Sequence, residues 1–339
     1  MPDAEPSPLP QELIGVPEND TALAEDLLRG IRRTYKECLA PILVSREKVN
    51  PVITGFEEKL HELNEKRANF YGRGYNPPEV FYVDHVGAMR RAKEINNTII
   101  KMGLGFYEPF DRYGALYAPI GNFIIIFLNN FENEDIDGWY ACGKLRHELS
   151  HAGSVTKHRV YQRGDSKPLY QEYRVGALLV QEGGNKLGLA AQEGHHAIED
   201  EIFEGKHRGL LSQDEYLKRI YDLRPIFPGA QEKYEQLRQS LIQRGVIPQD
   251  RMLIFYRKYG YAIESMKVAD SYEDYRDLMM LLYERRPELF RLFCDYTYGD
   301  KMINFAKGVE QTFGKGFFSK LMSVVDRESA RKLINECSR

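Results

Sequence analysis

The amino-acid sequence predicts an α+β fold with a mainly helical C-terminal half, and three observations lead to this prediction. Apolar residues recur at helical spacing from Thr21 to about Phe70, and again through most of the chain beyond Gly194. Between these parts, Val80–Val83 has the pattern of a short strand. Two β-rich segments follow, Tyr113–Ile120 and Phe123–Leu128, which adds a small, mostly antiparallel sheet to the helices.

The middle of the chain predicts a strand, a helix, a hairpin and a second helix, in that order. The first helix is expected over Met89–Met102. The pair Gly121-Asn122 joins the two β-rich segments and suits a tight hairpin turn. The second helix is expected to start at Asp135 or Asp137, whose carboxylates can cap it, and to run to about Ala152.

Breaks in composition divide the chain into four expected regions. Residues 1–20 are rich in Pro, Asp and Glu and are expected to form a flexible arm. A helical N-terminal segment covers residues 21–75, a core covers 76–206 and a helical C-terminal region covers 207–339. Within the core, a third helix is expected over Leu169–Gln181, because apolar residues dominate there and two glycines can end it.

The overall composition is that of an ordinary globular protein and excludes several classes of partner. The chain of 339 residues is 42% hydrophobic and carries a formal charge of −3, with Lys and Arg spread along its length. No basic block suggests nucleic acid or an anionic membrane surface. The longest apolar run, Phe123–Leu128, is far shorter than the roughly 20 residues that a membrane helix needs.

The cysteines and the N-terminus indicate the compartment. Four cysteines lie far apart and form no Cys-x-x-Cys pair, which predicts reduced thiols and no thiolate zinc site. Met1–Pro10 lacks the basic start and apolar core of a secretory signal. We therefore expect a cytoplasmic location.

A His-Glu-x-x-His motif within the second predicted helix carries the chemistry. His147 and His151 are four residues apart, so both imidazoles lie on one helix face and can bind one Zn²⁺ ion. Glu148 stands beside the metal position, where its carboxylate can accept a proton from an activated water. A similar start at His61-Glu62 has Glu65 in place of the second histidine and is expected to be a solvated helix face.

With its strand, helix and hairpin before the motif helix, the chain resembles the zincin metallopeptidases over about residues 80–205. Ser154 and Lys157 replace the glycine and the third histidine of the metzincin continuation. The chain is most similar to the gluzincins, whose third protein ligand is a glutamate on the next helix. The resemblance implies that residues 76–206 form a zincin-like catalytic core.

Two glutamates compete as the third ligand that this resemblance implies. Glu182 ends an apolar segment and is followed by two glycines, and Glu172 lies ten residues closer to the motif. Glu182 is favoured because the segment before it is more apolar and better suited to pack against the motif helix. His158 is a further candidate, but it follows Gly153 in an expected loop.

A zinc hydrolase also needs a donor that stabilises the oxyanion, and several residues are near enough in sequence to supply it. The candidates are Tyr170, Tyr173 and His195, together with Tyr161 and His196.

The sequence therefore predicts a zinc-dependent metallopeptidase that acts on a peptide or protein substrate, with one Zn²⁺ ion as cofactor. Two alternatives stay open: a zincin-fold binding or regulatory module with little catalysis, and a zinc hydrolase that cleaves a bond other than a peptide bond. The intact Glu148 argues against the first alternative, because a binding module has no chemical need for an acid there.

Overall fold

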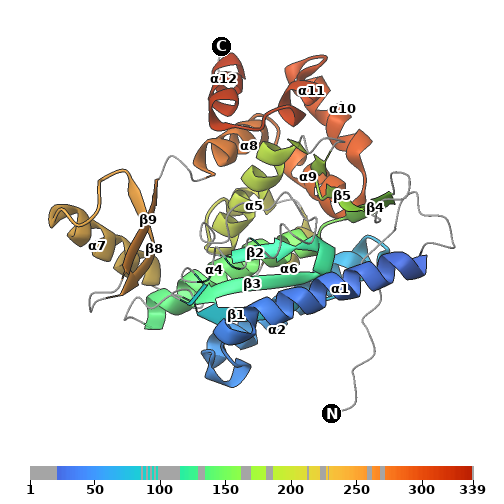
Figure 1. Cartoon of the computed structure of the whole chain (residues 1–339). Helices are drawn as coiled ribbons and strands as arrows, with labels where there is room; N and C mark the ends of the chain where they lie inside the picture. Colours follow the sequence, from blue (N-terminus) through green and yellow to red (C-terminus); the bar gives the residue numbers. More distant parts are fainter. Residues whose placement is uncertain are drawn as a thin grey trace.

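The computed structural model describes residues 21–84, 87, 88, 91, 94, 97, 115–128, 134–161, 169–180, 186–211, 214–221, 227, 229–257, 262–267 and 272–337. The architecture is mixed α+β, with small sheets among many helices (Figure 1). The arm of residues 1–20 and most of the helix expected over Met89–Met102 lie outside the described residues. None of the helices described is both long enough and apolar enough to span a membrane.

A three-stranded sheet contains the strand and the hairpin predicted from the sequence. Its order is β1-β3-β2: β1 (Glu79–Asp84) is parallel to β3 (Phe123–Leu128), and β2 (Ala115–Ala118) is antiparallel to β3. The first five residues of β3 are almost completely buried, as expected of a central strand covered on both faces. Asn122 makes the turn between β2 and β3 at a φ of 48°, a left-handed conformation that Asn tolerates better than most residues.

The expected N-terminal helices are present as α1 (Thr21–Leu39) and α2 (Pro51–Phe70). Pro51 occupies the first helical position of α2, and the side chain of Asn50 accepts the backbone N–H of Val52 at 2.9 Å. This cap and the preset φ of proline explain why the helix begins there. Short 3₁₀ turns at Ala40–Ile42 and Arg46–Lys48 connect the two helices.

The motif helix is α4 (Glu134–Gly153), close to its predicted bounds and with three acidic residues in its first turn. It packs against α2 on one side and against β2 and β3 on another. Its buried residues Ala141, Leu145 and Leu149 share a core cluster with Ile124 and Ile126 of β3. The motif is therefore held on a rigid element next to a sheet edge.

The segment after α4 forms strands, so the helix expected over Leu169–Gln181 is wrong. A four-stranded antiparallel sheet follows chain order and comprises β4 (Thr156–Tyr161), β5 (Leu169–Val175), β6 (Leu178–Val180) and β7 (Lys186–Leu187). Gly176 has a φ of 59° and makes the turn between β5 and β6. Short apolar runs of this kind fit a buried strand as well as a helix, and periodicity alone does not separate them.

The remaining chain is mainly helical, as predicted, with one exception. A 3₁₀ turn (Arg208–Leu211) follows α5 (Leu189–Phe203), and the later helices are α6 (Glu215–Ile220), α7 (Ala230–Gln243), α8 (Glu273–Arg285), α9 (Glu288–Gly299), α10 (Met302–Phe313), α11 (Phe317–Met322) and α12 (Arg327–Cys337). The exception is an antiparallel hairpin, β8 (Arg251–Arg257) and β9 (Ala262–Lys267), which stands with α7 to one side of the molecule (Figure 1). α7 packs against α4.

The largest core cluster joins residues on both sides of position 207. It contains Ile198 and Ile202 of α5 together with Leu278 of α8, Phe293 of α9 and Leu333 of α12. α5 and α8 pack side by side within it. The helical C-terminal region thus covers the face of α5 that points away from α4 (Figure 1).

Candidate metal centre

Helix α4 brings the two motif histidines together. The Nε2 atoms of His147 and His151 lie 3.3 Å apart, and both side chains are partly buried. Both point toward α5, because His147 and His151 each contact Glu193 of that helix. The predicted pairing of the histidines on one helix face is confirmed.

The structure places the carboxylate of Glu193 beside this pair of histidines, where it is a third candidate ligand. Its Oε2 atom lies 3.3 Å from His147 Nε2 and 3.6 Å from His151 Nε2. The three residues form one of the two described groups of His, Cys, Asp and Glu whose geometry could hold a metal ion. Oε2 is buried and, apart from its contacts with these two histidines, has no hydrogen-bond partner within the described part of the chain.

These distances fit a tetrahedral zinc site. Ligand atoms about 2.0–2.1 Å from a tetrahedrally bound Zn²⁺ lie roughly 3.3 Å from one another. Two of the three separations, 3.3 and 3.3 Å, match this edge length, and the third is slightly longer at 3.6 Å. Two imidazoles and one carboxylate would leave a fourth position open, as catalytic zinc sites require.

The electrostatics of the three residues favour a cation. Burial acts to raise the pKa of Glu193, but the charges of His151 and His147 outweigh it and hold the pKa well below its ordinary value. Burial acts to lower the pKa of His147, but hydrogen bonds to Asp200 and Glu193 outweigh it and raise the pKa well above its ordinary value. Glu193 is therefore ionised, and positive charge is stabilised between this carboxylate and the two histidines.

Asp200, seven residues and about two turns beyond Glu193 on α5, orients the first histidine. Its Oδ2 lies 3.2 Å from His147 Nδ1, and its Oδ1 accepts Arg146 Nε–H at 2.8 Å. Burial acts to raise the pKa of Asp200, but Arg146 and His147 outweigh it and the pKa falls below its ordinary value. An ionised Asp200 accepts the Nδ1 proton of His147 and leaves Nε2 free to bind a metal.

Replacing Asp200 with Asn is expected to weaken zinc binding by about 10- to 100-fold, the usual effect of losing a carboxylate behind a ligating histidine. The amide fills the same space but no longer offers a charged acceptor for the Nδ1 proton. Competition with a chelator of known affinity measures the change. A variant with the affinity of the wild type would contradict the orienting role.

His196 supports the site from behind His151. The two rings stack with centroids 4.3 Å apart and an interplanar angle of 19°. Gln192 uses its Oε1 to accept the backbone N–H of Ala177 at 2.6 Å, so its amide NH₂ faces His196 Nε2. His196 Nε2 is then an acceptor, and the proton sits on Nδ1, 3.4 Å from Glu199 Oε2.

Burial and the neighbouring charge of His151 hold the pKa of His196 well below its ordinary value. His196 is therefore a neutral packing partner of His151, and its role as an oxyanion donor stays a prediction.

Glu148 occupies the place that the motif assigns to a base. It points from α4 toward the neighbouring sheet, where its Oε2 accepts the backbone N–H of Tyr117 at 2.8 Å. Tyr117 belongs to β2, the edge strand of the three-stranded sheet. Glu148 and the sheet edge are thus in direct contact beside the candidate metal site.

The structure describes the other predicted residues to different extents. Glu182, the favoured third ligand, lies outside the described residues. Glu172 lies on β5 in register with His158 of β4, not on a helix. The backbones of Tyr161, Tyr170 and Tyr173 lie on these same two strands, and none of these five side chains is among those described.

His195 is placed away from the metal site, in the C-terminal core. It is fully buried, its Nδ1 pairs with the hydroxyl of Tyr283 at 2.8 Å, and its ring packs against Phe290 and Phe293. The next residue, His196, faces the candidate metal site, because adjacent residues of a helix point about 100° apart. From this position His195 does not reach a substrate at His147.

A second described group, His195, Glu199 and Cys294, has a geometry that could also hold a metal ion. Its carboxylate is already engaged: Glu199 accepts the hydroxyls of Tyr221 and Tyr298 and lies 3.5 Å from Arg67 Nη2. Burial raises the pKa of the Cys294 thiol, which disfavours a thiolate ligand. The guanidinium of Arg67 supplies the positive charge here. We therefore interpret this group as a buried cluster that stabilises the fold, and not as a metal site.

Tyr272 is a neighbour of the metal site that the sequence did not indicate. It immediately precedes α8, is 44% exposed and lies nearly parallel to the His147 ring, with centroids 6.2 Å apart. An exposed aromatic ring beside a metal ligand offers a wall for a substrate side chain. Only the tertiary packing of α8 against α5 brings it there.

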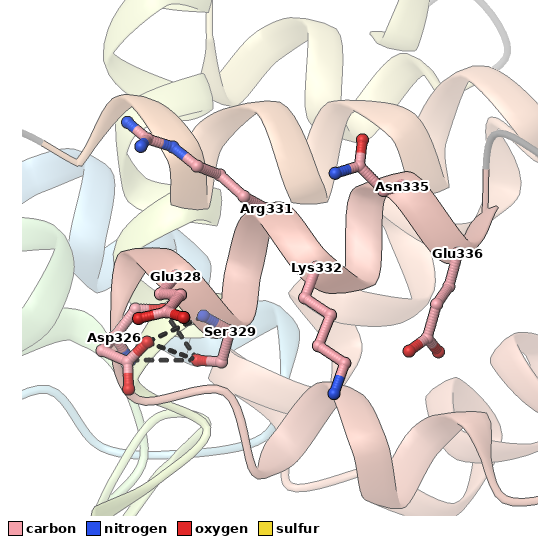
Figure 2. A pocket seen from close by; sticks show the side chains of 7 residues that line it. All are labelled: Asp326, Glu328, Ser329, Arg331, Lys332, Asn335 and Glu336. Atoms are coloured by element: carbon pink, nitrogen blue, oxygen red, sulfur yellow. Dashed lines mark hydrogen bonds between the residues drawn. The ribbon is translucent and has the colours of Figure 1, made fainter.

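A separate shallow pocket follows the exposed face of α12 and shares no residue with the metal site. Figure 2 shows its side chains, which are polar or charged and project from one helix and the turn before it. Asp326 and Ser329 are bonded to each other as a helix cap. We therefore interpret the polar residues of this pocket as the solvated surface of α12.

No protein-family model, curated protein or solved structure matches this chain in sequence or fold.

Proposed function

We propose that this chain is a zinc-dependent metallopeptidase of the gluzincin kind, in which His147, His151 and Glu193 hold the metal and Glu148 is the general base. The observation that carries the proposal is the triangle of ligand atoms, whose edges of 3.3, 3.3 and 3.6 Å are close to the edge of about 3.3 Å in a tetrahedral zinc site. The buried Glu193 Oε2 supports the same conclusion, because within the described chain it faces the two histidines without a further hydrogen-bond donor, and a buried carboxylate oxygen is costly unless it binds something.

Zinc, when bound, lowers the pKa of a water molecule and polarises the carbonyl under attack. Glu148 accepts a proton from the attacking water and later delivers it to the leaving amine. Asp200 keeps His147 in the tautomer that exposes Nε2, and His196 fixes the ring plane of His151. Each of these roles belongs to a residue on α4 or α5, the two rigid helices of the site.

The peptide substrate is supported by the position of the base beside a sheet edge. An extended chain can add to an exposed strand through main-chain hydrogen bonds, which gives affinity for peptides of many sequences. β2 is the edge strand of the described sheet next to α4, with Ala115, Tyr117 and Ala118 buried, and Glu148 accepts the backbone N–H of Tyr117.

The metal content of the purified protein tests the site without any assumption about substrate. Elemental analysis is expected to give about one zinc per chain in the wild type and in Glu182→Ala, and very little in His147→Ala and Glu193→Ala, because each of the latter removes one of three ligands. Circular dichroism controls for folding.

Zinc retained by Glu193→Ala but lost by Glu182→Ala would identify Glu182 as the third ligand instead. A wild type that binds no zinc, even after reconstitution, would overturn the proposed function. Parallel assays with matched peptide and ester substrates separate a peptidase from a hydrolase of other bonds.

A further inference from the structure

We propose that Lys144 of α4 binds a carboxylate of the substrate, so that the zinc-loaded protein selects peptides with an anionic group about two to four residues from the scissile bond. The inference rests on the proposed function and deepens it by naming the substrate class. Two sources share this chemistry: the C-terminal carboxylate of a short peptide, and the side chain of Asp or Glu within a longer one.

Lys144 lies on the same face of α4 as the two histidines and the proposed base. Successive residues of a helix point about 100° apart, which places Lys144 about 60° from His147 and about 40° from Glu148, in the angle between them. His151 lies in the same sector, and all four residues are partly exposed. A group bound at the candidate metal site therefore has Lys144 on the side toward the N-terminus of the helix.

The ammonium of Lys144 has no counter-ion in the described part of the chain. No described carboxylate forms an ion pair with it, and its Nζ lies over the ring of Tyr140, 5.4 Å from the centroid. Tyr140, Glu148 and Asp200 outweigh the effect of burial and raise its pKa above the ordinary value. Lys144 is therefore protonated and available to an incoming anion.

A bound zinc ion makes this position of a cation unfavourable unless an anion joins it. Lys144 lies about one turn before His147, and like charges repel one another more strongly in a partly buried site than in water. Glu148 does not bond to the ammonium, because its Oε2 accepts the backbone N–H of Tyr117. A substrate carboxylate at Lys144 offsets the repulsion and forms a charge-assisted hydrogen bond.

The spacing along α4 sets the position of the anion. At a rise of about 1.5 Å per residue, the level midway between His147 and His151 is about 7 Å from Lys144 and about 14 Å from Tyr140, and the ammonium reaches from the first level toward the second. An extended peptide advances about 3.3 Å per residue and covers this distance in about two to four residues. Tyr140 packs against a core cluster from α7 and β8, which limits how far a chain can continue on this face and favours a terminal carboxylate.

Matched peptides with and without the charge test the inference in the zinc-loaded wild type. One series places a free or an amidated C-terminus one to six residues after a fixed scissile bond. A second, blocked series places Glu or Gln at each position on both sides of the bond. We expect kcat/KM to be about 10- to 100-fold higher for the charged member at one position, the equivalent of one hydrogen bond to a charged group. Most of the difference should lie in KM, because the carboxylate is remote from the reacting atoms.

The two series separate the sources of the carboxylate. An effect in the first series alone identifies a terminal carboxylate as the group that Lys144 binds. An effect in the second series identifies an acidic side chain.

Lys144→Met and Lys144→Arg assign the effect to this residue. Methionine keeps an apolar stem and removes the charge, whereas arginine keeps the charge. The ratio of kcat/KM between charged and neutral peptides is expected to fall close to one in Lys144→Met and to remain well above one in Lys144→Arg. Lys332→Met is the matched control, because Lys332 is exposed on α12 away from the metal site, and it should keep the wild-type ratio. The zinc content of each variant shows whether the metal site is intact.

A ratio near one at every position in the zinc-loaded wild type, with neutral peptides still cleaved, would overturn the inference and leave the proposed function standing. A wild-type ratio in a zinc-binding Lys144→Met variant would overturn it as well. If methionine disturbs the fold, Lys144→Gln takes its place. A wild type that holds no zinc, or that cleaves no peptide when loaded with zinc, would overturn the proposed function and this inference with it.

Discussion

Glu148→Gln is expected to lower kcat by about 10²- to 10⁴-fold, the usual contribution of a positioned general base, with zinc still bound. The amide has nearly the shape of the carboxylate and can still accept the N–H of Tyr117 through its oxygen. It cannot accept the proton of the attacking water. Single-turnover rates on a cleaved peptide, together with the zinc content, measure the two parts of the prediction.

Glu62→Gln is the matched control for this substitution. Glu62 follows a histidine on α2 as Glu148 does on α4, but its side chain is exposed and away from the metal ligands. We expect wild-type turnover from it. Wild-type turnover in Glu148→Gln would instead show that the assigned base is wrong.

Glu199→Gln is expected to reduce the free energy of unfolding by about 3–5 kcal/mol, the typical cost of leaving a buried charge without its partner. Glu199 is completely buried between α2 and the C-terminal helices, next to Arg67 of α2. The guanidinium also lies over the ring of Tyr298, 3.9 Å from its centroid. Urea unfolding followed by circular dichroism measures the loss.

The same carboxylate predicts a pH dependence of stability. Burial acts to raise the pKa of Glu199, but Arg67 and His195 outweigh it and hold the pKa well below its ordinary value. Between its folded and unfolded pKa values, the unfolded state binds more protons, so stability from this group rises with pH. The contribution is complete above about pH 5 and is lost as the pH falls below about 4.5 toward the folded pKa. The difference between wild type and Glu199→Gln should shrink over that range.

The double variant Arg67→Met with Glu199→Gln provides the control. Removal of both charges leaves no uncompensated ion, so its stability loss should be smaller than that of Glu199→Gln alone. A loss equal to the sum of the two single variants would contradict the pairing of Arg67 with Glu199.

The sequence was sufficient for the features that depend on local pattern. The hairpin follows from Gly121-Asn122 between two β-rich runs, and α4 follows from its acidic start and helical spacing. His147 and His151 meet because four residues make about one helical turn. None of these features depends on a contact between distant segments.

Glu193, the third ligand that we propose, was not predicted because its position beside the histidines depends on tertiary packing. The apolar stretch before Glu182 was interpreted as the partner helix, but Leu178–Val180 is a strand. The partner helix is α5, which begins after Gly188 at a φ of 77°, and its midpoint glycine obscured its helical pattern. One signal was available: Glu193, His196 and Asp200 recur at helical spacing among apolar residues, which indicates a polar stripe on a buried helix.

Gly194 gives the C-terminal half a direct mechanical link to the metal site. A methyl group on this residue would lie 2.2 Å from the carbonyl oxygen of Tyr275, so α8 rests on the backbone of α5 directly beside Glu193. This close contact between α8 and α5 constrains the position of Glu193, whose distance to a bound zinc ion would have to lie within about 0.2 Å of the usual value. Residues of α8, about 80 positions later in the chain, therefore support the helix that carries Glu193. An engineer who wished to transplant this centre into another scaffold would have to carry α8 with it.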